Sequence, residues 1–348
     1  MVNEVTLNYM RQVAKHAVDI VSNVYLPDIK AIASFYPDWF KYGKGLAGIN
    51  MMSYGDFPEI ANDYSDKSIQ IPRGAIINGN LNEVFDVDTR DPEQVQEFVD
   101  HSWYKYPEAD KGLHPWDGIT DQHYELPPGS DGTETKFNWL APDGKYSWIK
   151  SPRWRGHMME VGPLARMVIG IAKNVPHYKE PALELLKELN LPLEAAFSTL
   201  GRHAARALEC EWMTHKLVQY IDDLTANIKA GDETAANMEF WEPKTWPKEC
   251  RGVGPCEAPR GALAHYCVIK NGRLENWQAV VPTTWNASPR SSEGQKGTYE
   301  LSLIGTPLAD PKRPLEIIRT IHSFDPCLAC ATHLYSPEGE ELTSVQVC

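Results

Sequence analysis

The sequence has no apolar run of the roughly 18 residues that a membrane-spanning helix requires. Its N-terminus, MVNEVTLNYMRQ, also lacks the basic start and apolar core of a secretory signal peptide. The chain contains no internal repeat and no low-complexity tract. We therefore expect neither a membrane-spanning protein nor a repeat array, and any export of the chain would depend on another carrier.

Basic residues are in the minority. Lys and Arg number 34 against 47 Asp and Glu, which gives a formal net charge of −13. A chain with this charge repels a phosphate backbone overall, so nucleic acid is not an expected partner. The 348 residues, 42% hydrophobic and 23% charged, are typical of a globular protein with a sizeable core.

Cysteines are few and odd in number. The seven positions are Cys210, Cys250, Cys256, Cys267, Cys327, Cys330 and Cys348. An odd count without a signal peptide argues against a disulfide framework and favours free thiols or metal ligands. Among the seven, one pair has the C-x-x-C spacing, which is Cys327 and Cys330.

Helical patterns dominate the chain. They predict helices over residues 5–33, 160–173, 179–189, 192–229 and 314–323. Pro27 is expected to kink or end the first of these helices, because proline lacks the N–H that a helix interior needs. The helix over 192–229 would be about 55 Å long at 1.5 Å per residue.

The β-structure is expected to be small. Residues 67–90 alternate weakly around Asn78-Gly79, and two further strands are expected over 262–269 and 277–281, joined at Asn271-Gly272. Residues 35–65 are expected to form a packed loop. The predicted fold class is therefore mainly α with small β-excursions (α+β), a long-helix bundle with one excursion over about residues 67–150.

The most specific motif is Asp325-Pro-Cys327-Leu-Ala-Cys330-Ala-Thr-His333. Asp and Pro are preferred at the start of a helix, so a helix is expected to begin here, with Cys327 in its first turn. The two sulfurs would then lie near one face and could bind one soft metal. His333 would point elsewhere. The same spacing also fits a chance pair of buried thiols, and one pair cannot complete a four-coordinate site.

Two other motifs contain polar residues that are candidates for a functional site. One is Glu257-Ala-Pro-Arg260-Gly, and the other is Val-Pro-Thr283-Thr-Trp-Asn-Ala-Ser-Pro-Arg290. Taken alone, Arg260 fits a structural ion pair and Thr283 fits a turn hydroxyl.

Together, these motifs resemble one family: the chain is similar to the large subunit of a nickel–iron hydrogenase of the membrane-associated uptake type. The resemblance runs from about residue 10 to the end. The matching blocks are SFYPDWF (34–40), SYGDFPE (53–59), SWIKSPRWRGHMMEVGPLAR (147–166), AAFSTLGRHAARALE (195–209), EAPRGALAH (257–265), ENWQAVVPTTWNASPR (275–290) and PLEIIRTIHSFDPCLACATH (314–333).

The resemblance implies a role for each matching residue at a Ni–Fe centre. Cys327 would be a terminal thiolate of nickel, and Cys330 would bridge nickel and iron. Arg260 would lie over the metals, where its fixed positive charge helps to split or position hydrogen, and Asp325 would be a carboxylate beside that arginine.

Further ligands are implied by the same resemblance. Pro259 and Thr283 would line the CN and CO ligands of iron, with Thr283 donating to a cyanide. His333 and the backbone carbonyl of Ala279 would bind a structural magnesium. Iron–sulfur clusters would lie only in a small-subunit partner, because this chain has too few cysteines to hold a series of clusters.

The sequence departs from the family pattern at both ends. Nothing in residues 1–60 replaces the family's N-terminal half, which holds the other C-x-x-C, a glutamate of the proton path and a glutamate that binds magnesium. We therefore expect one large-subunit-like domain over 1–333 that cannot build a complete Ni–Fe site alone. Residues 334–348 resemble the tail that a maturation protease removes after His333 once insertion factors have delivered nickel.

The resemblance also implies a location. The precursor would be cytoplasmic, and the mature chain would be membrane-associated on the periplasmic side after co-export with its partner.

Two other functions remain open from the sequence. The chain could be a non-catalytic fragment that binds partner or maturation proteins, which a second C-x-x-C on another segment would argue against. It could also be a simple zinc protein, which bound zinc without nickel or iron would favour.

Overall fold

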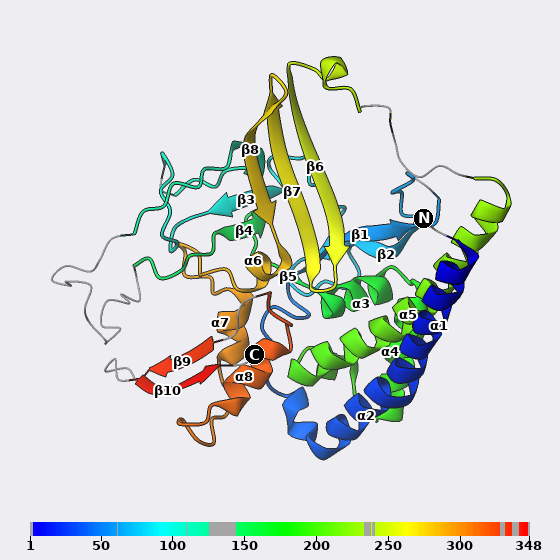
Figure 1. Cartoon of the computed structure of the whole chain (residues 1–348). Coiled ribbons are helices and arrows are strands. Elements are labelled where there is room, and N and C mark those ends of the chain that lie inside the picture. The colour runs from blue at the N-terminus through cyan, green and yellow to red at the C-terminus, as the bar shows by residue number, and fades with distance from the viewer. Residues whose placement is uncertain are drawn as a thin grey trace.

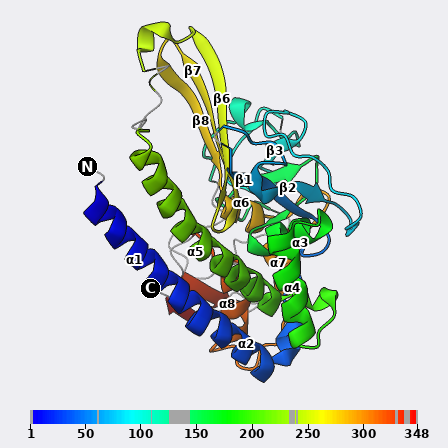
Figure 2. The same cartoon turned by 90° about the vertical axis from the view of Figure 1, so that its right-hand side faces the viewer.

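Two long helices lie side by side along one flank of the protein (Figures 1 and 2). The computed structural model describes residues 3–60, 62–108, 110–124, 144–232, 238, 241–327, 331–335 and 341–346, the last two as backbone. Helix α1 (Glu4–Ile20) packs along helix α5 (Thr199–Lys229), and Arg11 Nε donates to Asp222 at 2.6 Å. At 31 residues, α5 is about 46 Å long.

The remaining helices are shorter. They are α2 (Leu26–Phe35), α3 (Pro163–Ala172), α4 (Pro176–Glu188), α6 (Pro282–Asn286), α7 (Thr298–Leu303) and α8 (Leu315–His322). A five-residue π-helix, Val21–Tyr25, joins α1 to α2. Because Pro27 follows this segment in the first turn of α2, it does not end the helical run. Within the described residues, no helix combines the length and the apolar character needed to cross a bilayer.

The strands form small separate sheets. They are β1 (Met51–Pro58), β2 (Ile69–Ile76), β3 (Val95–Phe98), β4 (Ser151–Trp154), β5 (Glu160–Val161), β6 (Glu249–Ala258), β7 (Gly261–Lys270), β8 (Arg273–Val280), β9 (Ala331–Tyr335) and β10 (Glu341–Gln346). Their orders are β2-β1-β5, β3-β4, β6-β7-β8 and β10-β9, and the β1–β5 pair is the parallel one. The three-stranded sheet β6-β7-β8 projects from the body in both views (Figures 1 and 2).

Two buried clusters meet near the base of that sheet. One contains Trp154, Tyr266 and Trp285 together with residues of β1 and β7. The other packs α3 against α4 and α5, with Ile169 and Tyr178 fully buried. The arrangement of helices with small sheets confirms the predicted fold class. The Asn271-Gly272 turn between β7 and β8 is also confirmed.

Some local predictions are wrong. Residues 35–65 are not only a loop, because β1 lies within them and pairs with β2. The Asn78-Gly79 turn joins β2 to a single bridge, Ala75 with Phe85, instead of to a second long strand. Part of the C-terminal segment also forms strands that were not predicted, since β9 and β10 pair with each other.

The start of α5 differs from the prediction for a local reason. Residues Leu193–Ala196 form a 3₁₀ turn, and α5 begins after it, with the Ser198 hydroxyl accepting the Gly201 N–H at 3.1 Å. A Cβ on Gly201 would lie 1.9 Å from the Ala196 carbonyl oxygen. Glycine is therefore required where the helix passes the 3₁₀ turn.

Gly201→Ala should therefore destabilise the protein, although glycine-to-alanine changes inside exposed helices usually stabilise them. We expect a loss of about 1–3 kcal/mol in the free energy of unfolding, the usual cost of overpacking, measured by urea denaturation. The control is Asn227→Ala on the exposed part of the same helix, which should change stability by only a few tenths. A Gly201→Ala protein as stable as the parent would show that the contact with Ala196 is not restrictive.

Candidate metal centre

Arg260 lies at the tip of a long β-hairpin. Strand β6 ends at Ala258 and β7 begins at Gly261, so Pro259 and Arg260 form the two-residue turn between them. Gly261 has φ +129°, and a Cβ there would lie 2.6 Å from the backbone nitrogen of Gly162. The turn packs directly on the backbone before α3, and this contact fixes the position of the Arg260 backbone.

A buried arginine on α3 holds the end of β6. Arg166 is 1% exposed, and its five N–H groups donate to Glu209, Glu257 and the carbonyls of Ala258 and Pro259 at 2.5–3.0 Å. Burial disfavours the charge, but the neighbouring carboxylates outweigh it and raise the pKa of Arg166 above its ordinary value. Arg166, with all of its N–H groups hydrogen-bonded, therefore holds the backbone of Ala258 and Pro259 immediately before Arg260.

Arg260 reaches across to Asp325. Its Nε donates to the Asp325 carbonyl oxygen at 2.6 Å, and its Nη2 lies 3.2 Å from the Asp325 carboxylate. The Arg260 side chain is 36% exposed and that of Asp325 is 42% exposed. Two contacts to one residue orient the guanidinium, while part of it stays open to a ligand.

Cys327 is held from the other side by Thr283. The Cys327 backbone N–H donates to the Thr283 hydroxyl oxygen at 3.0 Å. Thr283 is 4% exposed on α6, where the side-chain amide of Asn286 bonds to both the N–H and the carbonyl of Val161. The Cys327 side chain itself is exposed. A buried hydroxyl therefore positions a cysteine whose sulfur is accessible.

Two arginines of α5 hold the segment before Asp325. Arg202 forms a bidentate ion pair with Glu160, at 2.7 and 2.9 Å, and its guanidinium lies 3.8 Å from the centre of the Phe324 ring. Arg206 donates to the Ser323 carbonyl at 2.8 Å. The guanidinium over the Phe324 ring and the hydrogen bond to the Ser323 carbonyl both restrain this backbone. Helix α5 therefore fixes the position of the segment that leads to Cys327.

The helix predicted to start at Asp325 is wrong. Asp325 has φ +55°, its N–H donates to the His322 carbonyl at 2.9 Å, and β9 begins at Ala331. The Asp-Pro pair therefore belongs to the end of α8 and not to the start of a new helix. Cys327 consequently does not lie in the first turn of a helix.

The structure brings four of the predicted residues together: Arg260, Asp325, Thr283 and Cys327. Pro259 is exposed in the turn beside Arg260. Ala279 lies on β8, paired with His265, and is exposed. Cys330 lies outside the described residues, as does the side chain of His333, so their predicted roles stay predictions. Sequence reasoning missed Arg166, Arg202 and Glu209, although each lies in a block that carries the resemblance.

The donor types at this site suit a soft transition metal. A thiol whose backbone is bound by a hydroxyl, two residues after an aspartate that is bound by a guanidinium, is the kind of environment that binds and tunes nickel, iron or zinc. Among the residues that the structure describes, no group of three or more His, Cys, Asp or Glu side chains is arranged to hold a metal. With Cys330 three residues further on, the chain offers two thiols, and a complete site needs additional ligands.

Comparison with known proteins identifies the family. The profile of the nickel-dependent hydrogenase family matches residues 1–333. The uptake hydrogenase large subunit of Rhizobium leguminosarum bv. viciae is 58% identical over 99% of this chain, and the hydrogenase-1 large chain of Escherichia coli K12 is 51% identical over the same share. The chain therefore belongs to the nickel-dependent hydrogenase family. It spans 58% of the length of each of these two relatives.

Solved structures agree with this assignment. The NiFeSe hydrogenase of Dm. baculatum superposes with a TM-score of 0.73 at 31% identity, covering 94% of this chain and 60% of that one. The Ni-Fe-Se hydrogenase of D. vulgaris Hildenborough superposes with a TM-score of 0.72 at 31% identity, covering 94% of this chain and 61% of that one.

Arg166→Met should destabilise the protein strongly. The change leaves the carboxylates of Glu209 and Glu257 buried without their cation, and we expect a loss of about 3–5 kcal/mol in the free energy of unfolding. The control is Arg251→Met, which removes an exposed ion pair with Asp117 and should cost under about 1 kcal/mol. Urea denaturation of both variants at pH 7 tests this. Equal small losses would show that the Arg166 cluster does not hold the β6–β7 turn.

A histidine of α5 makes stability depend on pH. Burial first, and then the charges of Arg206 and Arg202, lower the pKa of His203 to about 4. An unfolded histidine titrates near roughly 6.5. Between these values the unfolded state binds more protons, so this contribution is fully present above about pH 6.5 and is lost toward pH 4. The shift corresponds to at most about 3 kcal/mol.

Replacing His203 should flatten that profile. His203→Gln is expected to lose less stability than the parent between pH 7 and pH 4.5 in urea denaturation. His215→Gln, at an exposed position of the same helix, should keep the parental loss. If His203→Gln also keeps the parental loss, other groups cause the pH dependence.

Proposed function

We propose that this chain is the part of a nickel–iron hydrogenase large subunit that carries Cys327 and Cys330. In the assembled enzyme it would take part in the reversible oxidation of H₂ to protons and electrons. The observation that supports this most directly is the meeting of three distant motifs, with Arg260 bound to Asp325 and Cys327 bound to Thr283. Residue types alone would not bind a cation to the residue two positions before an accessible thiol.

Each of these residues has a defined task. Cys327 and Cys330 would hold the Ni–Fe centre through their thiolates, and that centre supplies the redox chemistry that activates H₂. A thiolate sulfur can hold the released proton. Arg260 provides a fixed positive charge beside the developing negative charge, oriented by Asp325, and no rearrangement is needed at the moment of reaction.

Other residues would complete the environment. Pro259 and Thr283 would line the CN and CO ligands of iron. Thr283, whose hydroxyl oxygen accepts from the Cys327 N–H, would donate its hydroxyl hydrogen to a cyanide. His333 and the Ala279 carbonyl would bind magnesium.

The proposal includes partners and a maturation route. Electrons would pass to an iron–sulfur small subunit. Residues 1–333 would form one domain, and a protease would remove residues 334–348 after His333 once insertion factors have delivered nickel. The precursor would be cytoplasmic, and the mature chain would be membrane-associated on the periplasmic side through co-export with the small subunit.

Metal content of the chain isolated with its partners from its native host tests the metal assignment. We expect nickel and iron in the parent and loss of nickel in Cys327→Ser and Cys330→Ser. Cys256→Ser is the control, because that half-buried thiol on β6 lies outside the motif. Zinc alone in the parent would favour a zinc–thiolate protein. A chain with no metal that still copurifies with its partners would indicate a non-catalytic fragment.

Arg260→Lys tests the role of the guanidinium. Lysine keeps the charge but cannot make two directed contacts to Asp325, so H₂ oxidation should fall by about 10²–10³-fold while the nickel content stays at the parental level. Activity is measured with an artificial electron acceptor in the assembled enzyme. Full activity in Arg260→Lys would remove Arg260 from the mechanism, and loss of nickel would assign it a structural role.

A further inference from the structure

A tyrosine of α7 lies beside the cysteine motif. Tyr299 is the second residue of this helix, and α7 contacts both α6, which carries Thr283, and α8, which precedes Asp325 (Figure 1). The Tyr299 ring packs on that of Phe324, with the two ring centres 4.8 Å apart. Since Phe324 comes three residues before Cys327, Tyr299 contacts the segment that leads to the cysteine.

Close backbone packing fixes the start of α7. A Cβ on Gly297, the residue before the helix, would lie 2.0 Å from the carbonyl oxygen of Ser288. The buried Thr298 hydroxyl donates to the Met159 carbonyl at 3.3 Å. Because Ser288 follows α6 by two residues, these contacts hold the backbone of Tyr299 in a set position relative to α6.

The Tyr299 hydroxyl is buried without a hydrogen bond. Its oxygen is closed to solvent, and no residue that the structure describes bonds to it with normal geometry. Buried polar groups are normally hydrogen-bonded, because an unpaired one loses its bonds to water without replacement. The hydroxyl therefore has a hydrogen to donate once an acceptor takes its place beside it.

Two groups of the candidate metal centre lie near that hydroxyl, namely the hydroxyl of Thr283 and the sulfur of Cys327. The Thr283 hydroxyl acts to lower the pKa of Tyr299, but the two hydroxyls do not form a hydrogen bond of normal geometry. Burial raises the pKa of Tyr299, and negative charge on the Cys327 sulfur raises it further, so the phenol keeps its hydrogen. Because hydrogen bonds to ionised acceptors are the stronger ones, a thiolate at Cys327 is the acceptor that suits this donor best.

We propose that Tyr299 is a positioning residue of the Ni–Fe centre and donates its phenolic hydrogen to the sulfur of Cys327 when that sulfur binds metal. This role rests on the proposed function, because it concerns the metal-bound thiolate. A hydrogen bond to a thiolate fixes its orientation and withdraws electron density from it, so the donor tunes the metals without touching them. Thr283 binds the backbone N–H of Cys327, so the two side chains would hold the same cysteine at two points.

The infrared stretching bands of CO and CN in the assembled enzyme test this role. In Tyr299→Phe the ring still packs on Phe324, and only the hydroxyl is lost. Without the hydrogen bond, the Cys327 sulfur donates more electron density to the metals and the iron donates more to its CO ligand. The CO band should therefore move to lower wavenumber.

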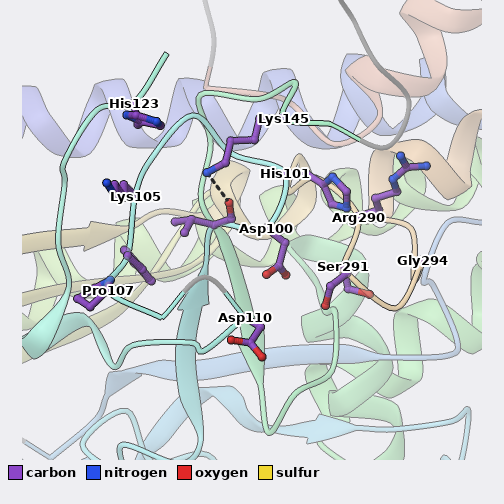
Figure 3. A pocket seen from close by; sticks show the side chains of 13 residues that line it. Asp100, His101, Lys105, Pro107, Asp110, His123, Lys145, Arg290, Ser291 and Gly294 are labelled. Carbon is purple, nitrogen blue, oxygen red and sulfur yellow. Dashed lines mark hydrogen bonds between the residues drawn. The ribbon is translucent and has the colours of Figure 1, made fainter. Parts of the chain in front are cut away.

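Tyr106→Phe is the matched control. Tyr106 is 4% exposed, and its hydroxyl also lacks a partner within the described residues. It lines a separate cavity of about 830 Å³, where Figure 3 shows its neighbours Lys105 and Pro107, and neither Tyr299 nor Cys327 lines that cavity. This variant loses the same kind of hydroxyl, so its CO and CN bands should equal those of the parent.

Each outcome of this experiment decides a separate point. If Tyr299→Phe leaves the bands of the parent unshifted, or shifts them no more than Tyr106→Phe does, the role of Tyr299 is overturned and the proposed function stands. Loss of every band in Tyr299→Phe alone would assign the tyrosine a structural role and would also overturn the proposal. A parent enzyme without CO and CN bands would contradict the proposed function itself, and the role of Tyr299 with it.

Discussion

The charge of Arg166 is buried among α3, α5 and β6, and the position of the candidate site depends on how that charge is neutralised. Glu209 and Glu257 meet it from residues 43 and 91 positions away in the chain. Breaking a buried ion pair is costly, because it leaves an unpaired charge without water. The three elements are therefore tied together, and Arg260 follows Glu257 by only three residues.

Helix α5 connects the two halves of the site. Glu209 on this helix fixes the β6–β7 turn through Arg166, while Arg202 and Arg206 fix the segment that leads to Asp325. The same rigid element thus sets both the guanidinium and the cysteine motif. A thiolate site needs this geometric control, because a fixed cation assists only when it stays beside the reacting group.

The sequence revealed the chemistry of the site more fully than its geometry. The C-x-x-C spacing singled out Cys327, the resemblance to the family added Arg260, and the turn at Asn271-Gly272 followed from local turn preferences. The helix predicted at Asp325 failed because Asp-Pro was interpreted as a helix start, whereas the end of α8 places Asp325 at φ +55°. Arg166 was missed because its partners are distant in sequence, so no local pattern shows that it is buried.

The account predicts that metal, guanidinium and cysteines meet at one point in the assembled protein. A crystal structure of the chain with its partners, with anomalous data at the nickel edge, tests this directly. We expect the nickel peak at bonding distance from the sulfurs of Cys327 and Cys330, with Arg260 facing it and still bonded to Asp325. A nickel peak away from both sulfurs, or none at the cysteines, would contradict the account.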